Sequence, residues 1–108
     1  MRPRLCAGTI LLALPATAVT PAGAAETIQV TVDKVAFRPA QVSAHVGDTI
    51  EWVSADFVAH TATARNKHWD VAIPAKGSGR VTLTSRAEID YYCRFHPNMV
   101  GHISVTSE

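Results

Sequence analysis

The sequence contains very little sulfur, with two cysteines and two methionines in 108 residues. Met1 and Cys6 lie at the very start of the chain, whereas Cys93 and Met99 lie near its end. If the N-terminal segment is removed, a single cysteine remains and an internal disulfide is excluded. A lone thiol in an oxidising compartment is a liability unless something occupies it. Cys93 and Met99, six residues apart, are therefore the first candidates for a functional site.

The sequence also lacks an excess of charge of either sign. Ten Lys and Arg residues stand against nine Asp and Glu, for a formal net charge of +1. Losing Arg2 and Arg4 with an N-terminal segment leaves eight against nine, a net charge of −1. Such a close balance of positive and negative side chains is not the signature of a nucleic-acid-binding protein. It does not favour binding to anionic membranes either.

No apolar run is long enough for a regular membrane-spanning helix. The longest, residues 5–19, is broken by Pro15 and is shorter than the ~20 apolar residues that such a helix needs. A basic start precedes this run, and small residues ending in Ala24 and Ala25 follow it. This pattern is typical of a secretory signal peptide and favours it over a membrane anchor.

The sequence therefore predicts two parts with different fates. We expect residues 1–25 to be a signal peptide, cleaved after Ala24 or Ala25, and residues 26–108 to be one exported domain. The predicted location is the periplasm. We expect the mature domain to be a monomer without a membrane anchor.

Sustained helical periodicity is absent after residue 25. Short runs alternate apolar and polar residues, as at residues 28–32, and turn residues such as those at 47–48 separate them. About eight short strands with this spacing predict an all-β fold, either a sandwich or a barrel. The large core residues are expected to be Phe37, Trp52 and Trp69, and Tyr91 is expected to form a tyrosine corner.

The strongest chemical motif is Cys-x-x-His-x-x-Met, formed by Cys93, His96 and Met99. From one loop, a thiolate and an imidazole can bind one soft or borderline metal, and a thioether can reach it weakly. Two histidines and a cysteine in a plane, with a distant axial methionine, are the ligands of a blue-copper electron-transfer site. The motif lacks one member of that set, a second histidine from elsewhere in the chain.

Four other histidines are available: His45, His60, His68 and His102. His60 is the best candidate because it begins a predicted strand soon after the apolar run at residues 50–52. A residue at a strand edge there can face a loop contributed by a distant strand. The other three are interpreted as ordinary surface or rim histidines.

At these segments the chain resembles the cupredoxins, and among them amicyanin, pseudoazurin and plastocyanin. The resemblance rests on residues 46–53, the region of His60 and the loop at residues 93–101. The short ligand loop, with Pro97 directly after His96, looks most like that of amicyanin. The resemblance implies a Greek-key β-sandwich that binds one copper ion through His60, Cys93, His96 and Met99.

The same resemblance implies a function without catalysis. The protein would carry single electrons by alternating between Cu(I) and Cu(II). Its partners would be transient redox proteins such as a c-type cytochrome, an amine dehydrogenase or another periplasmic oxidoreductase. Two departures bear on potential and partner: Thr61 stands where the family usually has Asn, and Arg94-Phe95 stands where it often has Pro.

Three other functions use some of the same residues. A catalytic Cys–His pair would leave His60 and Met99 without a role. Zinc prefers thiolate, imidazole or carboxylate to a thioether as its fourth ligand. Copper storage or delivery would use all four residues, but the mature chain has a single Met and no Met- or His-rich tract. Electron transfer is therefore the favoured interpretation.

Overall fold

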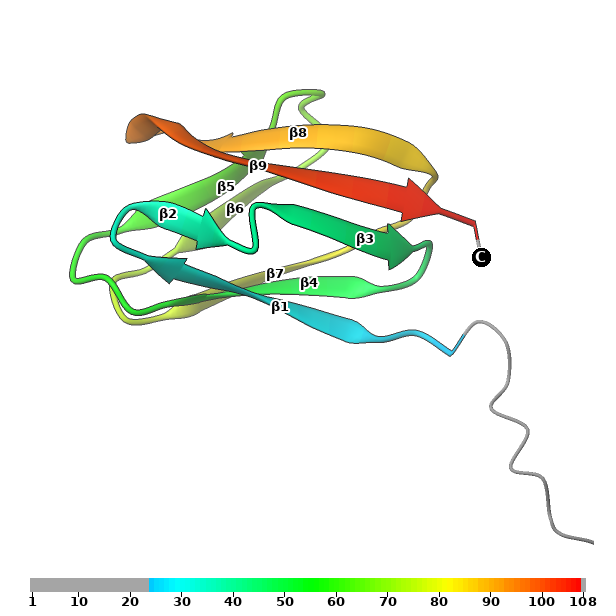
Figure 1. Cartoon of the computed structure of the whole chain (residues 1–108), viewed down its shortest axis with the longest axis horizontal. Helices are drawn as coiled ribbons and strands as arrows, with labels where there is room; N and C mark the ends of the chain where they lie inside the picture. The colour runs from blue at the N-terminus through cyan, green and yellow to red at the C-terminus, as the bar shows by residue number, and fades with distance from the viewer. Residues whose placement is uncertain (1–23, 108) are drawn as a thin grey trace, which may run out of the picture.

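The computed structural model describes residues 24–107, which form nine strands and no helix. Figure 1 shows the chain running back and forth between the two ends of an elongated sandwich. The strands are β1 (Thr27–Asp33), β2 (Ala36–Arg38), β3 (Gln41–His45), β4 (Thr49–Ser54), β5 (His60–Ala64), β6 (Asp70–Ile73), β7 (Ser78–Thr82), β8 (Ala87–Cys93) and β9 (His96–Thr106).

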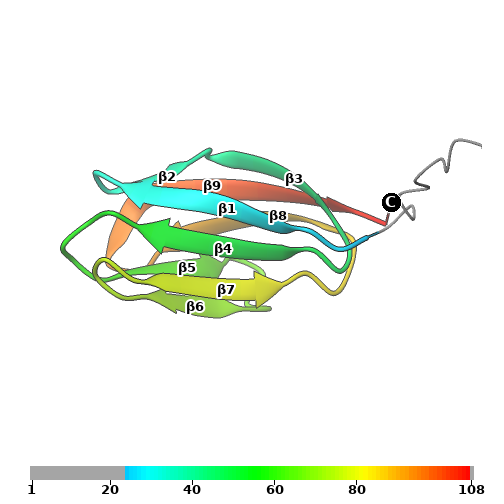
Figure 2. The same cartoon turned by 90° about the horizontal axis from the view of Figure 1, so that it is seen from below.

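The strands form two sheets that face each other across the core. One sheet has the order β2-β1-β4-β7 and the other β3-β9-β8-β5-β6. Figure 1 shows the two layers one above the other, and Figure 2 looks onto the first sheet with the second behind it. β1 pairs in parallel with β4, and β3 in parallel with β9, while the other pairs are antiparallel. The predicted all-β Greek-key sandwich is confirmed.

The alternation in the sequence becomes the two faces of each strand. In β1, Val30 and Val32 are buried while their neighbours face outward, and in β4 Ile50 and Trp52 are buried in the same way. Because successive side chains of a strand point to opposite faces, each sheet presents one apolar face to the other. The alternation of apolar and polar residues that predicted the strands therefore also forms the core between the two sheets.

The strand count exceeds the predicted eight by one, because the chain reverses between β1 and β2. Lys34 and Val35 have φ angles of 53° and 58°. This left-handed conformation is uncommon for any residue except glycine and rare for a β-branched one. The segment that contains Phe37 is therefore a separate strand, β2, which pairs antiparallel with β1.

Aromatic residues fill the centre of the core. Trp52 and Phe37 are buried as predicted, whereas Trp69 is only partly buried and packs on the core from one side. The Tyr91 ring lies 4.7 Å from that of Phe37 and 5.5 Å from that of Trp52. Gly101 lies opposite Tyr91 on β9, where a Cβ atom would collide with the tyrosine ring.

The predicted tyrosine corner is not what the structure shows. In such a corner the tyrosine hydroxyl bonds to backbone a few residues upstream. Here the hydroxyl of Tyr91 accepts a hydrogen bond from the Trp52 indole Nε1 at 3.2 Å. Burial raises the pKa of Tyr91 to about 12. Tyr91 therefore stays neutral and joins the two sheets through a side-chain contact.

The predicted signal peptide lies almost wholly outside the described residues, so this division of the chain stays a prediction. Within residues 24–107, no helix is long and apolar enough to cross a membrane.

Four connections meet at one end of the sandwich. They are the turn between β1 and β2, the β4–β5 loop, the β6–β7 loop and the β8–β9 turn (Figures 1 and 2). The β4–β5 loop leads into His60 and the β8–β9 turn joins Cys93 to His96. The fold therefore brings three of the predicted ligands to the same end.

Candidate metal centre

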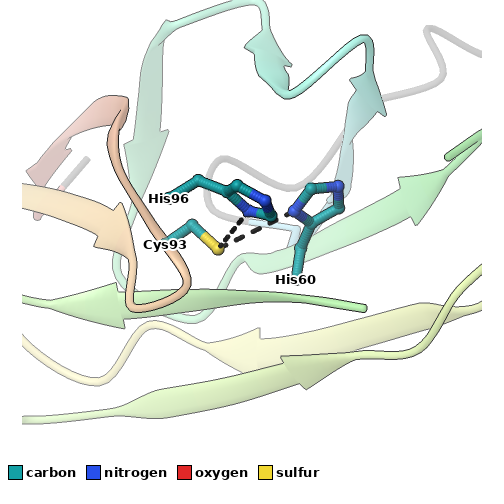
Figure 3. Close-up of side chains that lie close together, drawn as sticks. All are labelled: His60, Cys93 and His96. Atoms are coloured by element: carbon teal, nitrogen blue, oxygen red, sulfur yellow. Dashed lines mark hydrogen bonds between the residues drawn. The ribbon is translucent and has the colours of Figure 1, made fainter. Parts of the chain in front are cut away.

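His60, Cys93 and His96 converge on one point at this end of the sandwich. His60 is the first residue of β5, Cys93 the last of β8 and His96 the first of β9. Cys93 and His96 face each other across the β8–β9 turn, and His60 arrives from the strand beside β8. Figure 3 shows both imidazole rings directed toward the cysteine sulfur.

The distances between the three side chains fit a shared metal ion. Cys93 Sγ lies 3.7 Å from His60 Nδ1 and 3.7 Å from His96 Nδ1, and all three ligand atoms lie within 4.8 Å of one another. Metal–nitrogen bonds of about 2.0 Å and metal–sulfur bonds of about 2.3 Å, set about 120° apart, would separate sulfur from nitrogen by about 3.7 Å. A single thiol proton cannot bond both nitrogens at once. The three side chains are thus arranged as a copper-binding site.

The centre is enclosed on most sides. His60 is 1% exposed and Cys93 is fully buried, whereas His96 is half-buried. Cys93 is a free thiol. Burial of two ligands excludes water from the interior side, and the partial exposure of His96 leaves one imidazole edge toward the surface.

Met99, the predicted axial ligand, is buried close to this centre. Its side chain is 2% exposed, although its neighbours on β9 include exposed residues. Met99 and His96 line one hollow of about 370 Å³ at this end, together with Val35, Phe95, Pro97 and Asn98. Coordination by Met99 stays a prediction.

Known proteins share this fold. A model of the cupredoxin-like domain matches residues 4–105. The chain belongs to the cupredoxin-like family. The Cu(I) form of an amicyanin methionine-to-alanine variant aligns at 22% identity and a TM-score of 0.66, covering 77% of this chain and 85% of that one. A reduced amicyanin proline-to-phenylalanine variant aligns at 24% identity and 0.64, covering 73% and 81%. These similarities support the predicted cupredoxin fold and its likeness to amicyanin.

The three remaining histidines of this cupredoxin lie away from the centre, as predicted. His45 ends β3 at the opposite end of the sandwich, and His68 is exposed in the loop before β6. His102 bonds Asp90 at 2.8 Å and Glu88 at 2.7 Å on the outer face of β8 and β9. These two carboxylates, Asp90 foremost, raise the pKa of His102.

Asp56 holds His60 in the orientation that metal binding requires. Asp56 Oδ2 accepts a hydrogen bond from His60 Nε2 at 2.7 Å. An ionised carboxylate only accepts, so the proton of the neutral ring resides on Nε2, and Nδ1 is free to face Cys93. A carboxylate behind a ligand histidine also makes the ligand nitrogen more basic. Sequence reasoning missed Asp56, although it stands only four residues before a candidate ligand.

The same carboxylate secures the left-handed turn between β1 and β2. It accepts the amide hydrogens of Lys34 at 2.8 Å and Val35 at 3.0 Å. Bonds from the Val35 amide, the His60 ring and the Lys34 amide hold the pKa of Asp56 below its ordinary value. Val35 lines the hollow beside His96. Asp56 therefore couples a metal ligand to a turn at the rim of the site.

Thr61 takes the place of the usual cupredoxin asparagine and bonds the thiolate loop twice. Its backbone amide donates to Cys93 Sγ at 3.3 Å, and its hydroxyl accepts the Arg94 amide hydrogen at 2.9 Å. The first bond stabilises negative charge on the sulfur, and the second fixes the residue that follows it. Thr61 therefore restrains the thiolate loop through both its backbone and its side chain.

Two hydroxyl groups connect the thiolate loop to an exposed carboxylate by hydrogen bonds in series. Because the Thr63 hydroxyl gives its single proton to Asp70, the Thr61 hydroxyl donates to Thr63 Oγ1, 2.9 Å away. The Thr63 hydroxyl donates to Asp70 Oδ1 at 2.7 Å, and Arg94 Nε donates to the same oxygen at 3.2 Å. The Thr63 hydroxyl and the Arg94 guanidinium lower the pKa of Asp70. The Arg94 side chain thus closes a ring of contacts around the loop.

The Asp56→Asn substitution tests the support of His60. An amide nitrogen at the Oδ1 position would oppose the Lys34 amide, and one at the Oδ2 position would oppose the Val35 amide and His60 Nε2. In either orientation the negative charge behind His60 is lost, which weakens its support. We expect the affinity for Cu(I) to fall about 10- to 100-fold, the range for lost partners of metal-bound histidines. Competition with a coloured Cu(I) chelator measures this.

Asp33→Asn is the matched control for Asp56→Asn, because it removes the same charge from the end of β1 without touching His60. Equal losses of affinity in the two variants would show that general electrostatics, and not the Asp56–His60 hydrogen bond, supports the site.

The Thr61→Val substitution tests the support of the thiolate loop. The Arg94 amide would lose its acceptor, at a cost of about 1–3 kcal/mol if no water replaces it. We expect a shifted reduction potential or faster copper loss, measured by voltammetry and by transfer to a chelator. Thr61→Ser keeps the hydroxyl and should behave like the parent chain. If Val and Ser variants are alike, the hydroxyl has no such role.

Proposed function

We propose that this protein is an exported one-electron carrier whose single copper ion is bound by His60, Cys93, His96 and Met99. The observation that carries the proposal is the placement of Cys93 Sγ at the same 3.7 Å from both imidazole Nδ1 atoms. Thiolate, two imidazoles and a weak axial thioether are the blue-copper donor set. Copper bound there would supply a one-electron redox couple.

The residues around the site suit electron transfer better than catalysis. Four protein ligands would leave no position open for a substrate, in contrast to a catalytic metal site. Asp56 and Thr61 restrain His60 and Cys93 from outside the ligand set, so the ligands need little rearrangement between oxidation states. The half-buried edge of His96 is the proposed route for the electron.

Location and partners follow from the same proposal. The signal peptide at residues 1–25 would export residues 26–108 to the periplasm as a monomer. There the protein would exchange electrons with transient partners such as a c-type cytochrome, an amine dehydrogenase or another periplasmic oxidoreductase. Contacts of this kind are small and short-lived.

Copper storage or delivery is the alternative that uses the same ligands. Handing a metal to another protein requires ligands that the acceptor can reach. His60, Cys93 and Met99 are each no more than 2% exposed. The burial of three of the four proposed ligands therefore favours retention of the metal and exchange of electrons alone.

The direct test is the colour of the purified mature protein after addition of Cu(II). Charge transfer from the Cys93 thiolate should give an intense blue absorption, and the Cys93→Ser variant should be colourless. Met99→Gln should stay blue with a lower potential, because the axial ligand tunes the couple. A colourless copper complex of the parent chain would refute the proposal, and an unchanged potential in Met99→Gln would remove Met99 from the axial position.

A further inference from the structure

Asp48 is a buried carboxylate at the end of the sandwich opposite the metal centre. It lies in the turn between β3 and β4 and is 3% exposed. The Glu26 backbone amide donates to its Oδ1 at 2.9 Å, and the His45 amide donates to its Oδ2 at 2.8 Å. These two bonds, that of Glu26 foremost, lower the pKa of Asp48. Asp48 is therefore ionised at neutral pH.

This buried negative charge has little positive charge beside it. Within residues 24–107, the only basic side chain at ion-pair distance from Asp48 is that of His45, whose Nδ1 lies 3.8 Å from Oδ2. The His45 side chain is 55% exposed, and an imidazole carries a charge only when it is protonated. Burial of an ionised carboxylate is costly unless a cation accompanies it. A permanent cation beside Asp48 would therefore stabilise the folded domain.

The contact between Glu26 and Asp48 lies where the paired backbone of the domain begins. The Glu26 carbonyl accepts the Thr49 amide hydrogen at 2.9 Å, and β1 starts at the next residue and pairs in parallel with β4. Figure 1 shows the β3–β4 turn at the same end of the sandwich as the start of β1. Ala24 and Ala25 are exposed and precede the first strand. Glu26 is thus the first residue that the sheet holds.

The predicted signal peptide ends at this same boundary, and its sequence allows two cuts. Cleavage after Ala24 and cleavage after Ala25 both leave small residues at the first and third positions before the cut. The two products differ at Asp48. A cut after Ala25 turns the Glu26 nitrogen, already 2.9 Å from Asp48 Oδ1, into an ammonium group. A cut after Ala24 leaves that nitrogen a neutral amide and puts the ammonium one residue away, about 3.3–3.6 Å further along an extended chain.

We propose that the mature chain begins at Glu26 and that its new α-ammonium group forms an ion pair with Asp48. A signal peptidase would hydrolyse the Ala25–Glu26 bond with one water. The water oxygen bonds to the Ala25 carbonyl carbon, the C–N bond breaks, and both water hydrogens end on the Glu26 nitrogen. The products are the Ala25 carboxylate of the released peptide and the Glu26 ammonium, so processing itself creates a cation beside Asp48.

The charge makes this contact stronger than the one it replaces. A hydrogen bond between an ammonium and a carboxylate is roughly twice as strong as one between neutral groups. The proposal rests on the export that is part of the proposed function, but it does not depend on copper. The two ends of the sandwich therefore carry separate sites, the metal centre at one and the anchored N-terminus at the other.

N-terminal sequencing and intact mass of the exported protein test the cut directly. The full chain is expressed in a Gram-negative host, and the protein is purified from the periplasm. We expect chains that begin at Glu26. A product that begins at Ala25, or at any other residue, overturns the inference while export stands. A full chain that stays uncut refutes the predicted signal peptide, and with it the exported carrier of the proposed function.

Urea unfolding of the copper-loaded mature protein tests the ion pair. One chain begins at Glu26 with a free α-amino group, and its matched control is the same chain acetylated on that nitrogen. Acetylation restores an amide, so the hydrogen bond to Asp48 stays and only the charge is lost. Near pH 7, where an α-amino group is largely protonated, the ratio of folded to unfolded protein should be about three- to tenfold higher for the free amine.

The Asp48→Asn substitution assigns this difference to one carboxylate. In that variant the free and acetylated chains should be equally stable. Asp33→Asn removes the same charge from the other end of β1, and there the three- to tenfold difference should persist. Equal stability of the free and acetylated parent chains, or an undiminished difference in Asp48→Asn, would show that no such ion pair exists.

A crystal structure of the chain that begins at Glu26 keeps the test decisive if Asp48→Asn does not fold. The ammonium nitrogen should lie about 2.7–2.9 Å from an Asp48 carboxylate oxygen. An ammonium group turned into solvent, beyond the roughly 4 Å of an ion pair, would overturn the inference.

Discussion

The contact between Cys93 Sγ and the two imidazole Nδ1 atoms is the constraint on which the rest of the structure depends. The sulfur lies 3.7 Å from each nitrogen, although His60 is far from Cys93 and His96 in the chain. The β8–β9 turn supplies two of these three atoms, and β5 supplies the third. Hydrogen bonds from outside the ligand set then fix His60 through Asp56 and the thiolate loop through Thr61.

Much of this could be predicted from the sequence because the signals are local. The alternation at residues 28–32 predicts a strand wherever it lies, and the Cys93-to-Met99 spacing predicts shared ligation within one loop. His60 could be proposed only by elimination and resemblance, since its partners lie 33 and 36 residues away in the sequence. In the folded structure, the ligand atoms of the three residues lie within 4.8 Å of one another.

What the sequence did not predict depends on conformation or on distant contacts. The left-handed turn at Lys34 and Val35 contains no glycine that would predict it, so the sequence does not indicate that a separate strand follows β1. Asp56 could not be recognised before its carboxylate was seen to bond both that turn and His60. Tyr91 was expected to bond backbone, but the buried indole of Trp52, 39 residues earlier, takes its hydroxyl instead.

The geometry implies that this cupredoxin holds His60, Cys93 and His96 in place before copper binds. Crystal structures of the metal-free and Cu(II) forms test it most directly. We expect both Sγ–Nδ1 separations to stay within a few tenths of an ångström of 3.7 Å in the two forms. Copper should lie about 2.0–2.3 Å from all three atoms. Metal bound elsewhere, or His96 swung away from Cys93 in the metal-free form, would contradict it.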